Sequence, residues 1–126
     1  PLASGLLTGK MNRDSTFPED DHRNFNIEGA AFDRGETFAG VDFQRGLEAV
    51  EQLRALVPPG SSLAQLALKW ILSFEAVSVA IPGAKNPEQA KSNAGSSTLP
   101  PLSQDTMERI GRIYDTLIRP DVHQRW

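Results

Sequence analysis

The sequence contains no cysteine, and this absence excludes two classes of protein. Without thiols, the chain can form neither a disulfide framework nor a thiolate metal site. A basic excess is also missing, because 13 Lys and Arg stand against 16 Asp and Glu, for a net charge of −3. Nucleic-acid binding needs a stripe of positive charge along the phosphate backbone. We therefore expect no nucleic-acid partner.

Long apolar runs are missing as well. No stretch approaches the roughly 18 apolar residues that cross a bilayer, and residues 1–10 lack the layout of a signal peptide. We expect no membrane association and a cytoplasmic location, which the lack of cysteine suits. The 126 residues, 39% of them hydrophobic, suffice for one globular domain. The chain opens without methionine on what resembles the exit from a buried strand, so we expect a fragment of a longer protein.

Three parts can be distinguished within this single domain, 1–126. Residues 11–41 show no sustained period and predict a long loop, although the loop carries aromatic residues that favour packing over disorder, namely Phe17, Phe25, Phe32 and Phe38. Residues 42–118 predict the order helix, helix, strand, helix, helix. Residues 119–126 predict a C-terminal tail that extends across a surface.

Local signals mark the starts of the helices and the strand. Ser62 and Gln65 have the spacing of a capping box, and Asn86 before a proline is typical of a helix N-terminus, as is Ser103. The apolar, β-branched run at 76–81 predicts a buried strand. One strand cannot form a sheet, so these elements require partners that this chain does not contain.

The strand-to-helix junction at 81–87 is the first candidate site. The predicted strand ends before Gly83, Lys85 follows, and a helix starts at once. Free backbone amides and the positive end of the helix dipole form an anion site there, and Lys85 adds a full charge. In (β/α)8 barrels, phosphate sites commonly occupy the loops after the last two strands. The alternative is an ordinary turn with an exposed lysine.

Two other patterns suggest a nucleotide. Gln89 and Asn93 lie four residues apart on one helix face, where two carboxamides suit the edge of an adenine; a polar solvent face is the alternative. Near the N-terminus, Gly5, a second glycine and Lys10 would let a pyrophosphate approach the backbone. The spacing is not that of a Walker loop, and these residues are equally compatible with an incidental loop.

Together, PLASGLLTGK at 1–10 and IPGAKNPEQAKSNAGS at 81–96 resemble the nucleotide-binding segments of the aldo-keto reductases. The resemblance is to the branch with bacterial general-stress reductases and potassium channel β-subunits. It implies an α/β fold, namely a C-terminal fragment of a (β/α)8 TIM barrel that is mainly helical in the part present. It also implies NADPH as cofactor and hydride transfer to a small-molecule carbonyl substrate, an aldehyde or a ketone.

The resemblance also assigns cofactor contacts. The nicotinamide and pyrophosphate would lie beside Pro1, Leu2, Ala3, Ser4 and Gly5, and the phosphates would contact Lys10 and Arg23. The 2′-phosphate of the adenosine ribose would bind at Gly83 and Lys85, and the adenine at Gln89 and Asn93. Ser92 replaces a glutamate that is frequent in the family, so one adenosine contact departs from the pattern. Lys85 favours NADPH over NADH because a cation pairs with a phosphate.

The family's catalytic Asp, Tyr, Lys and His all precede the first residue of this chain, so we expect no catalytic residue here. Tyr114 belongs to the core face of the last predicted helix. His22 and His123 fall in the loop and the tail and do not form a metal site. The acidic run 19–21 is interpreted as a solvated face.

Two alternatives to an enzyme fragment stay open. One is a nucleotide-sensing regulatory or binding subunit on the same scaffold, and the other is a self-associating helical fragment without activity. On the enzyme hypothesis the complete protein is active and this fragment alone is inactive. Association of identical chains is compatible with all three hypotheses.

Overall fold

The computed structural model describes residues 1–125; Trp126, the last residue of the predicted tail, lies outside the described residues. Within this range the chain is helical and has no strand. Its α-helices are α1 (His22–Phe25), α2 (Phe43–Arg54), α3 (Leu63–Ile71), α4 (Pro87–Gly95), α5 (Gln104–Ile113) and α6 (Arg119–Val122). A π-helical turn (Tyr114–Ile118) joins α5 to α6. No helix among residues 1–125 has the length and apolar composition that a membrane span needs.

The predicted helix starts are confirmed by their caps. The Ser62 hydroxyl accepts a hydrogen bond from the Gln65 amide at 3.2 Å, and the Gln65 side chain accepts one from the Ser62 amide at 3.0 Å. At α4, the Asn86 side chain accepts from the Gln89 amide at 2.9 Å, and at α5 Ser103 plays the same part. These bonds satisfy amides that a helix start leaves without partners.

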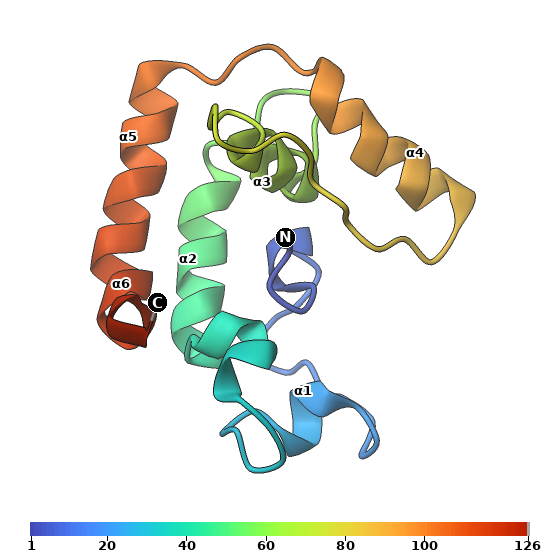
Figure 1. The fold of residues 1–126 in the computed structure, drawn as a ribbon, viewed down its shortest axis with the longest axis vertical. Coiled ribbons are helices and arrows are strands. Elements are labelled where there is room, and N and C mark those ends of the chain that lie inside the picture. Colours follow the sequence, from blue (N-terminus) through green and yellow to red (C-terminus); the bar gives the residue numbers. More distant parts are fainter. Residues whose placement is uncertain (126) are drawn as a thin grey trace.

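The core forms where α2 and α3 meet the N-terminal segment. Figure 1 shows α5 alongside α2, with the N-terminal turn (Leu6–Thr8) on the other side of α2. Leu6 is 5% exposed, and it belongs to a buried cluster with Phe38, Leu47, Val50, Leu56, Leu63 and Leu66. Burying this set removes apolar surface from water, which is the main stabilising contribution. Leu6 therefore anchors the first ten residues to α2 and α3.

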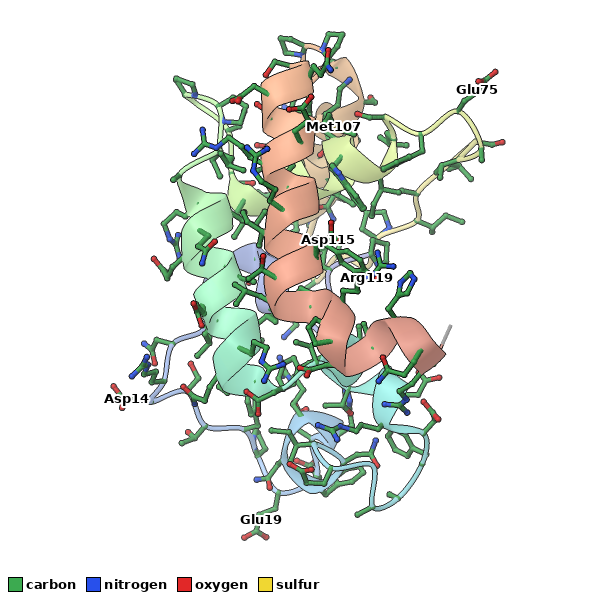
Figure 2. All side chains as sticks on the ribbon, turned by 90° about the vertical axis from the view of Figure 1, so that its left-hand side faces the viewer. Asp14, Glu19, Glu75, Met107, Asp115 and Arg119 are labelled. Carbon is green, nitrogen blue, oxygen red and sulfur yellow. The ribbon has the colours of Figure 1, made fainter. Side chains whose placement is uncertain are left out.

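The prediction of a strand at 76–81 is wrong for the described chain. This segment is an irregular loop between α3 and α4, in which Val79 and Ile81 are 66% and 82% exposed. Backbone amides from 78 to 84 donate to no other described backbone group. A strand exists only through pairing with a neighbour, and residues 1–125 supply none. Glu75 projects away from the helices at the start of this loop (Figure 2).

The loop predicted at 11–41 packs as expected at two of its aromatic residues. The rings of Phe17 and Phe38 lie 5.9 Å apart, and Phe38 is 1% exposed. Phe25 and Phe32 meet edge to face at 6.0 Å but stay 44% and 43% exposed. The loop also contains α1 and two 3₁₀ turns, Arg34–Glu36 and Phe38–Gly40.

The described part of the predicted tail is helical, with α6 followed by a 3₁₀ turn (His123–Arg125), and Val122 is buried. Asp115 in the π-helical turn forms an ion pair at 3.2 Å with Arg119, the first residue of α6 (Figure 2). Asp121 in α6 pairs with Arg45 near the start of α2. Arg125 lies 3.7 Å from Asp33. The tail thus ties the start of α2 to the preceding loop.

Two helical glycines allow a test of the contact between Leu6 and α2. A Cβ at Gly46 would lie 2.6 Å from Leu6 Cδ2, whereas a Cβ at Gly111 in α5 would meet no described atom within 4 Å. We expect Gly111→Ala to raise the free energy of unfolding by about 0.5–1 kcal/mol, since alanine is the better helix former. Gly46→Ala should lower it by about 1–3 kcal/mol through overpacking against buried Leu6. Denaturant unfolding of the full-length protein measures both, and equal stabilisation by the two would contradict this contact.

Candidate functional site

The first group of predicted site residues forms a tight left-handed turn. Ala3, Ser4 and Gly5 have φ angles of 47°, 53° and 89°, and two of these residues are not glycine. The Ser4 hydroxyl accepts from the Phe38 amide at 3.0 Å and lies 3.4 Å from the Glu36 carbonyl oxygen. Left-handed backbone costs about 1–3 kcal/mol at a non-glycine residue and persists where neighbours fix it, often at ligand sites. Ser4 fixes this turn onto the following loop.

Leu2 and Pro1 complete this group. The Leu2 carbonyl accepts from the Gly5 amide at 3.1 Å and from the Leu7 amide at 3.2 Å, which closes the turn. Pro1 is exposed and lies at the rim of an apolar cavity of about 550 Å³. The cavity is lined by the inner faces of three helices, with Leu66, Trp70, Ile71, Ile110 and Ile113 among its residues. Sequence analysis missed this cavity because a helical pattern does not tell how far neighbouring helices cover each other.

Arg23 is brought to this turn from the next loop. Its Nη1 lies 3.5 Å from the Ser4 carbonyl oxygen, and its guanidinium carbon lies 4.6 Å from the centre of the Phe17 ring. Asp21 holds the same guanidinium through two bonds, Nε to Oδ1 at 2.9 Å and Nη2 to Oδ2 at 2.6 Å. These hydrogen bonds from Arg23 lower the pKa of the Asp21 carboxyl well below its usual range.

The assignment of Asp21 to a solvated acidic face is therefore wrong. Glu19 does point into solvent (Figure 2), and Asp20 is exposed. The Asp21 side chain is only 19% exposed because it caps α1 and binds Arg23. The spacing Asp-x-Arg at a helix start was a usable signal, since an aspartate cap lies within reach of a side chain two residues on.

The second group gathers where the loop at 83–85 meets α4. The Gln89 side-chain oxygen accepts from the Lys85 amide at 2.8 Å, and the Asn93 side-chain nitrogen donates to the Gly83 carbonyl at 3.2 Å. Two carboxamides on one helix face thus fasten the loop to the helix. The structure brings together all four residues that the sequence assigned to this end of a nucleotide.

The prediction of free amides at this junction is wrong at two positions. The Lys85 amide is bonded to Gln89, and the Gln89 amide is bonded to Asn86. Pro87 has no amide hydrogen, so in the first turn of α4 only the Glu88 amide lacks an acceptor among the described residues. Side-chain capping takes up the donors that a simple helix start would leave open. Positive charge at this junction comes mainly from Lys85, which is exposed and has no ion pair within residues 1–125.

The two groups do not contact each other directly. No hydrogen bond or ion pair between described residues joins 1–5 to 83–93, and α3, which packs on both the Leu6–Thr8 turn and α4, separates them. Lys10 joins neither group. Its side chain is exposed, and its amide lies 3.4 Å from the Thr8 hydroxyl.

The tyrosine and the two histidines have local partners. The Tyr114 hydroxyl lies 3.0 Å from His123 Nδ1, and His22 Nδ1 lies 3.1 Å from the Thr37 hydroxyl. In the described part of the chain, no cluster of three His, Asp or Glu side chains is arranged to hold a metal ion. Tyr114 thus holds the tail against the π-helical turn, and His22 holds two parts of the 11–41 loop together.

The hydrogen bond between Gln89 and Lys85 predicts a measurable protection. We expect Gln89→Ala in the full-length protein to speed hydrogen exchange at the Lys85 amide by several fold, because the amide loses its acceptor. Gln104→Ala is the control, since among residues 1–125 the Gln104 side chain bonds to the Glu108 side chain alone. Exchange at Lys85 that is the same in both variants would contradict the capping geometry.

Comparison with known proteins places both groups within one family match. The model of the Aldo/keto reductase family matches residues 1–115. The chain is 38% identical over 90 residues to aldo-keto reductase YhdN of Bacillus subtilis (strain 168), covering 70% of this chain and 24% of that protein. It is 38% identical over 95 residues to L-glyceraldehyde 3-phosphate reductase of Escherichia coli O157:H7, covering 74% of this chain and 25% of that protein.

The reductase of the same name from Escherichia coli (strain K12) is 36% identical over 95 residues. The chain spans about a quarter of the length of these relatives, which are all reductases by name. The family match includes both groups of candidate residues and most of the sequence. This chain therefore belongs to the aldo/keto reductase family, a family of oxidoreductases.

Proposed function

We propose that this chain is the NADPH-binding C-terminal part of an oxidoreductase that reduces aldehydes or ketones by hydride transfer. The observation that carries the proposal is the gathering of polar and cationic residues into two groups on the segments that resemble nucleotide-binding sequences. Arg23 reaches the turn at Ser4 from another loop, and Lys85 lies beside Gly83 without an acidic partner among the described residues. Family membership supports the reductase class.

The chemistry of the second group suits the adenosine end of NADPH. A 2′-phosphate needs a cation, and Lys85 is the exposed cation at this junction. A Cβ at Gly83 would meet no described atom within 4 Å, so a ligand can approach the backbone there. Gln89 Nε2 and Asn93 Oδ1 have no hydrogen-bond partner among residues 1–125, which leaves one donor and one acceptor for an adenine.

The chemistry of the first group suits the pyrophosphate and nicotinamide end. Arg23 keeps donors that Asp21 does not use, and Lys10 adds an exposed charge on the same segment. The left-handed turn at 3–5 is held rigid by Ser4, so it can present its backbone to a ligand without further ordering. When bound, NADPH supplies the hydride; the residues of this chain hold and orient it.

We further propose that the fold is the C-terminal portion of a (β/α)8 barrel whose catalytic residues lie outside this chain. The β-branched segment 76–81, with exposed Val79 and Ile81 and unpaired backbone amides, would pair as a strand in the complete barrel. The apolar cavity between α2, α3 and α5 would then be covered. The fragment alone would be inactive, and the complete protein would act in the cytoplasm, without a nucleic-acid or membrane partner.

Carbonyl reduction can be tested on the full-length protein. We expect aldehyde-dependent oxidation of NADPH in a panel that includes L-glyceraldehyde 3-phosphate, the compound in the names of two relatives. NADPH oxidation is followed by the loss of its absorbance. Tight NADPH binding without turnover of any carbonyl would favour the nucleotide-sensing subunit instead, and absence of NADPH binding would contradict both.

Cofactor selectivity tests the role of Lys85. We expect Lys85→Met in the full-length protein to weaken NADPH binding by about 10- to 100-fold and to leave NADH binding nearly unchanged, because a charge-assisted contact to the 2′-phosphate is lost. A fluorescence titration with each cofactor measures this effect. Lys91→Met is the matched control, since Lys91 is an exposed lysine on α4, the helix that follows Lys85. An equal loss of affinity for NADPH and NADH would show that Lys85 does not bind the 2′-phosphate.

A further inference from the structure

Arg23 is held on three sides before any ligand is considered. Asp21 binds its Nε and Nη2 at 2.9 and 2.6 Å, and the Ser4 carbonyl oxygen lies 3.5 Å from Nη1. The guanidinium carbon lies over the Phe17 ring, 4.6 Å from the ring centre. An arginine side chain otherwise samples many rotamers, and fixing them costs free energy when it binds a partner. Here that freedom is already restricted.

The geometry of the guanidinium shows what remains available. The group carries five N–H donors in a planar fork. Asp21 takes the edge formed by Nε and Nη2, so the end formed by the remaining hydrogens of Nη1 and Nη2 is bonded to no other described side chain. This end lies at the Ser4 carbonyl. The Arg23 side chain is 26% exposed, and Ser4, Asp21 and Arg23 line one open pocket.

Asp21 is itself fixed by the start of α1. Its Oδ1 accepts from the Arg23 amide at 2.9 Å as well as from Arg23 Nε. One carboxylate thus caps the helix and clamps the side chain that follows two residues later. The hydrogen bonds from Arg23 lower the pKa of Asp21, so the carboxylate is ionised at neutral pH, where it acts as the clamp.

We infer that Asp21 is a positioning residue for the cofactor: it holds Arg23 so that the free end of the guanidinium faces a phosphate oxygen beside the Ser4 turn. The inference rests on the proposed function, since it requires the nucleotide's pyrophosphate at this turn. Charge repulsion alone predicts the opposite effect, because a carboxylate near a phosphate weakens phosphate binding unless it acts through a cation. Whether NADPH affinity falls or rises when the Asp21 charge is removed therefore decides between the two.

Asp21→Asn in the full-length protein is the central variant. Asparagine keeps the helix cap but removes the ionised clamp. We expect NADPH affinity to fall about fivefold to tenfold, because a released arginine must be reordered on binding, while kcat at saturating NADPH stays unchanged. The matched control is Asp20→Asn, which removes the same charge from an exposed neighbour whose side chain makes no hydrogen bond to a described residue. This control should bind NADPH as tightly as the original protein or slightly more tightly.

A double-mutant cycle separates positioning from general loss of structure. Arg23→Lys keeps the charge but lacks the planar fork. We expect the effect of Asp21→Asn to vanish in the Arg23→Lys background, since the carboxylate then has no fork to orient. Fluorescence titration with NADPH gives all affinities, and thermal unfolding of each variant should show that it is folded at the temperature of the titration.

The outcomes distinguish this inference from the proposed function. If the original protein does not bind NADPH, the proposed function fails and this inference fails with it. If the original protein binds NADPH but Asp21→Asn behaves like Asp20→Asn, or binds more tightly, only the role of Asp21 is overturned. An unchanged effect of Asp21→Asn in the Arg23→Lys background would likewise overturn it.

Discussion

The burial of Leu6 against α2 and α3 is the contact on which the arrangement of this chain depends. Leu6 is 5% exposed, and Gly46 in α2 leaves the space that its side chain fills. This contact holds the strained turn at 3–5 in a defined place, so that Arg23 from the 11–41 loop can reach the Ser4 carbonyl. Without the apolar anchor, the left-handed backbone would relax, because its strain is opposed only by neighbouring contacts.

Polar side chains then act as fasteners at both candidate groups. Ser4 holds the 34–40 region, Asp21 holds Arg23, and the carboxamides of Gln89 and Asn93 hold the loop before α4. Ser4, Asp21 and Gln89 accept from backbone or guanidinium donors, and Asn93 donates to the Gly83 carbonyl. Such bonds contribute modestly to stability, but they fix the orientation of the Arg23 guanidinium and of the loop that carries Lys85. They leave Lys85 and one end of Arg23 as the groups that can meet an anion.

The loop at 76–81 and the apolar cavity have one physical cause, namely that neither finds enough neighbours among the described residues. A β-branched segment has no local way to satisfy its backbone, unlike a helix, and needs a neighbouring strand. The inner faces of α2, α3 and α5 likewise offer more apolar surface than they cover among themselves. In the proposed (β/α)8 barrel, neighbouring strands and helices would cover both features.

By itself, the sequence determined the four helices α2 to α5, the caps at Ser62, Asn86 and Ser103, and the family. Ser62 and Asn86 cap helices through bonds of three residues' span, and such local bonds need no tertiary partner. Only the tertiary structure decided that Asp21 clamps Arg23 instead of facing water, and that amides at Lys85 and Gln89 are already bonded. It also decided that 76–81 is no strand here. Local patterns fix what a segment prefers, whereas pairing and burial depend on which neighbours are present to meet it.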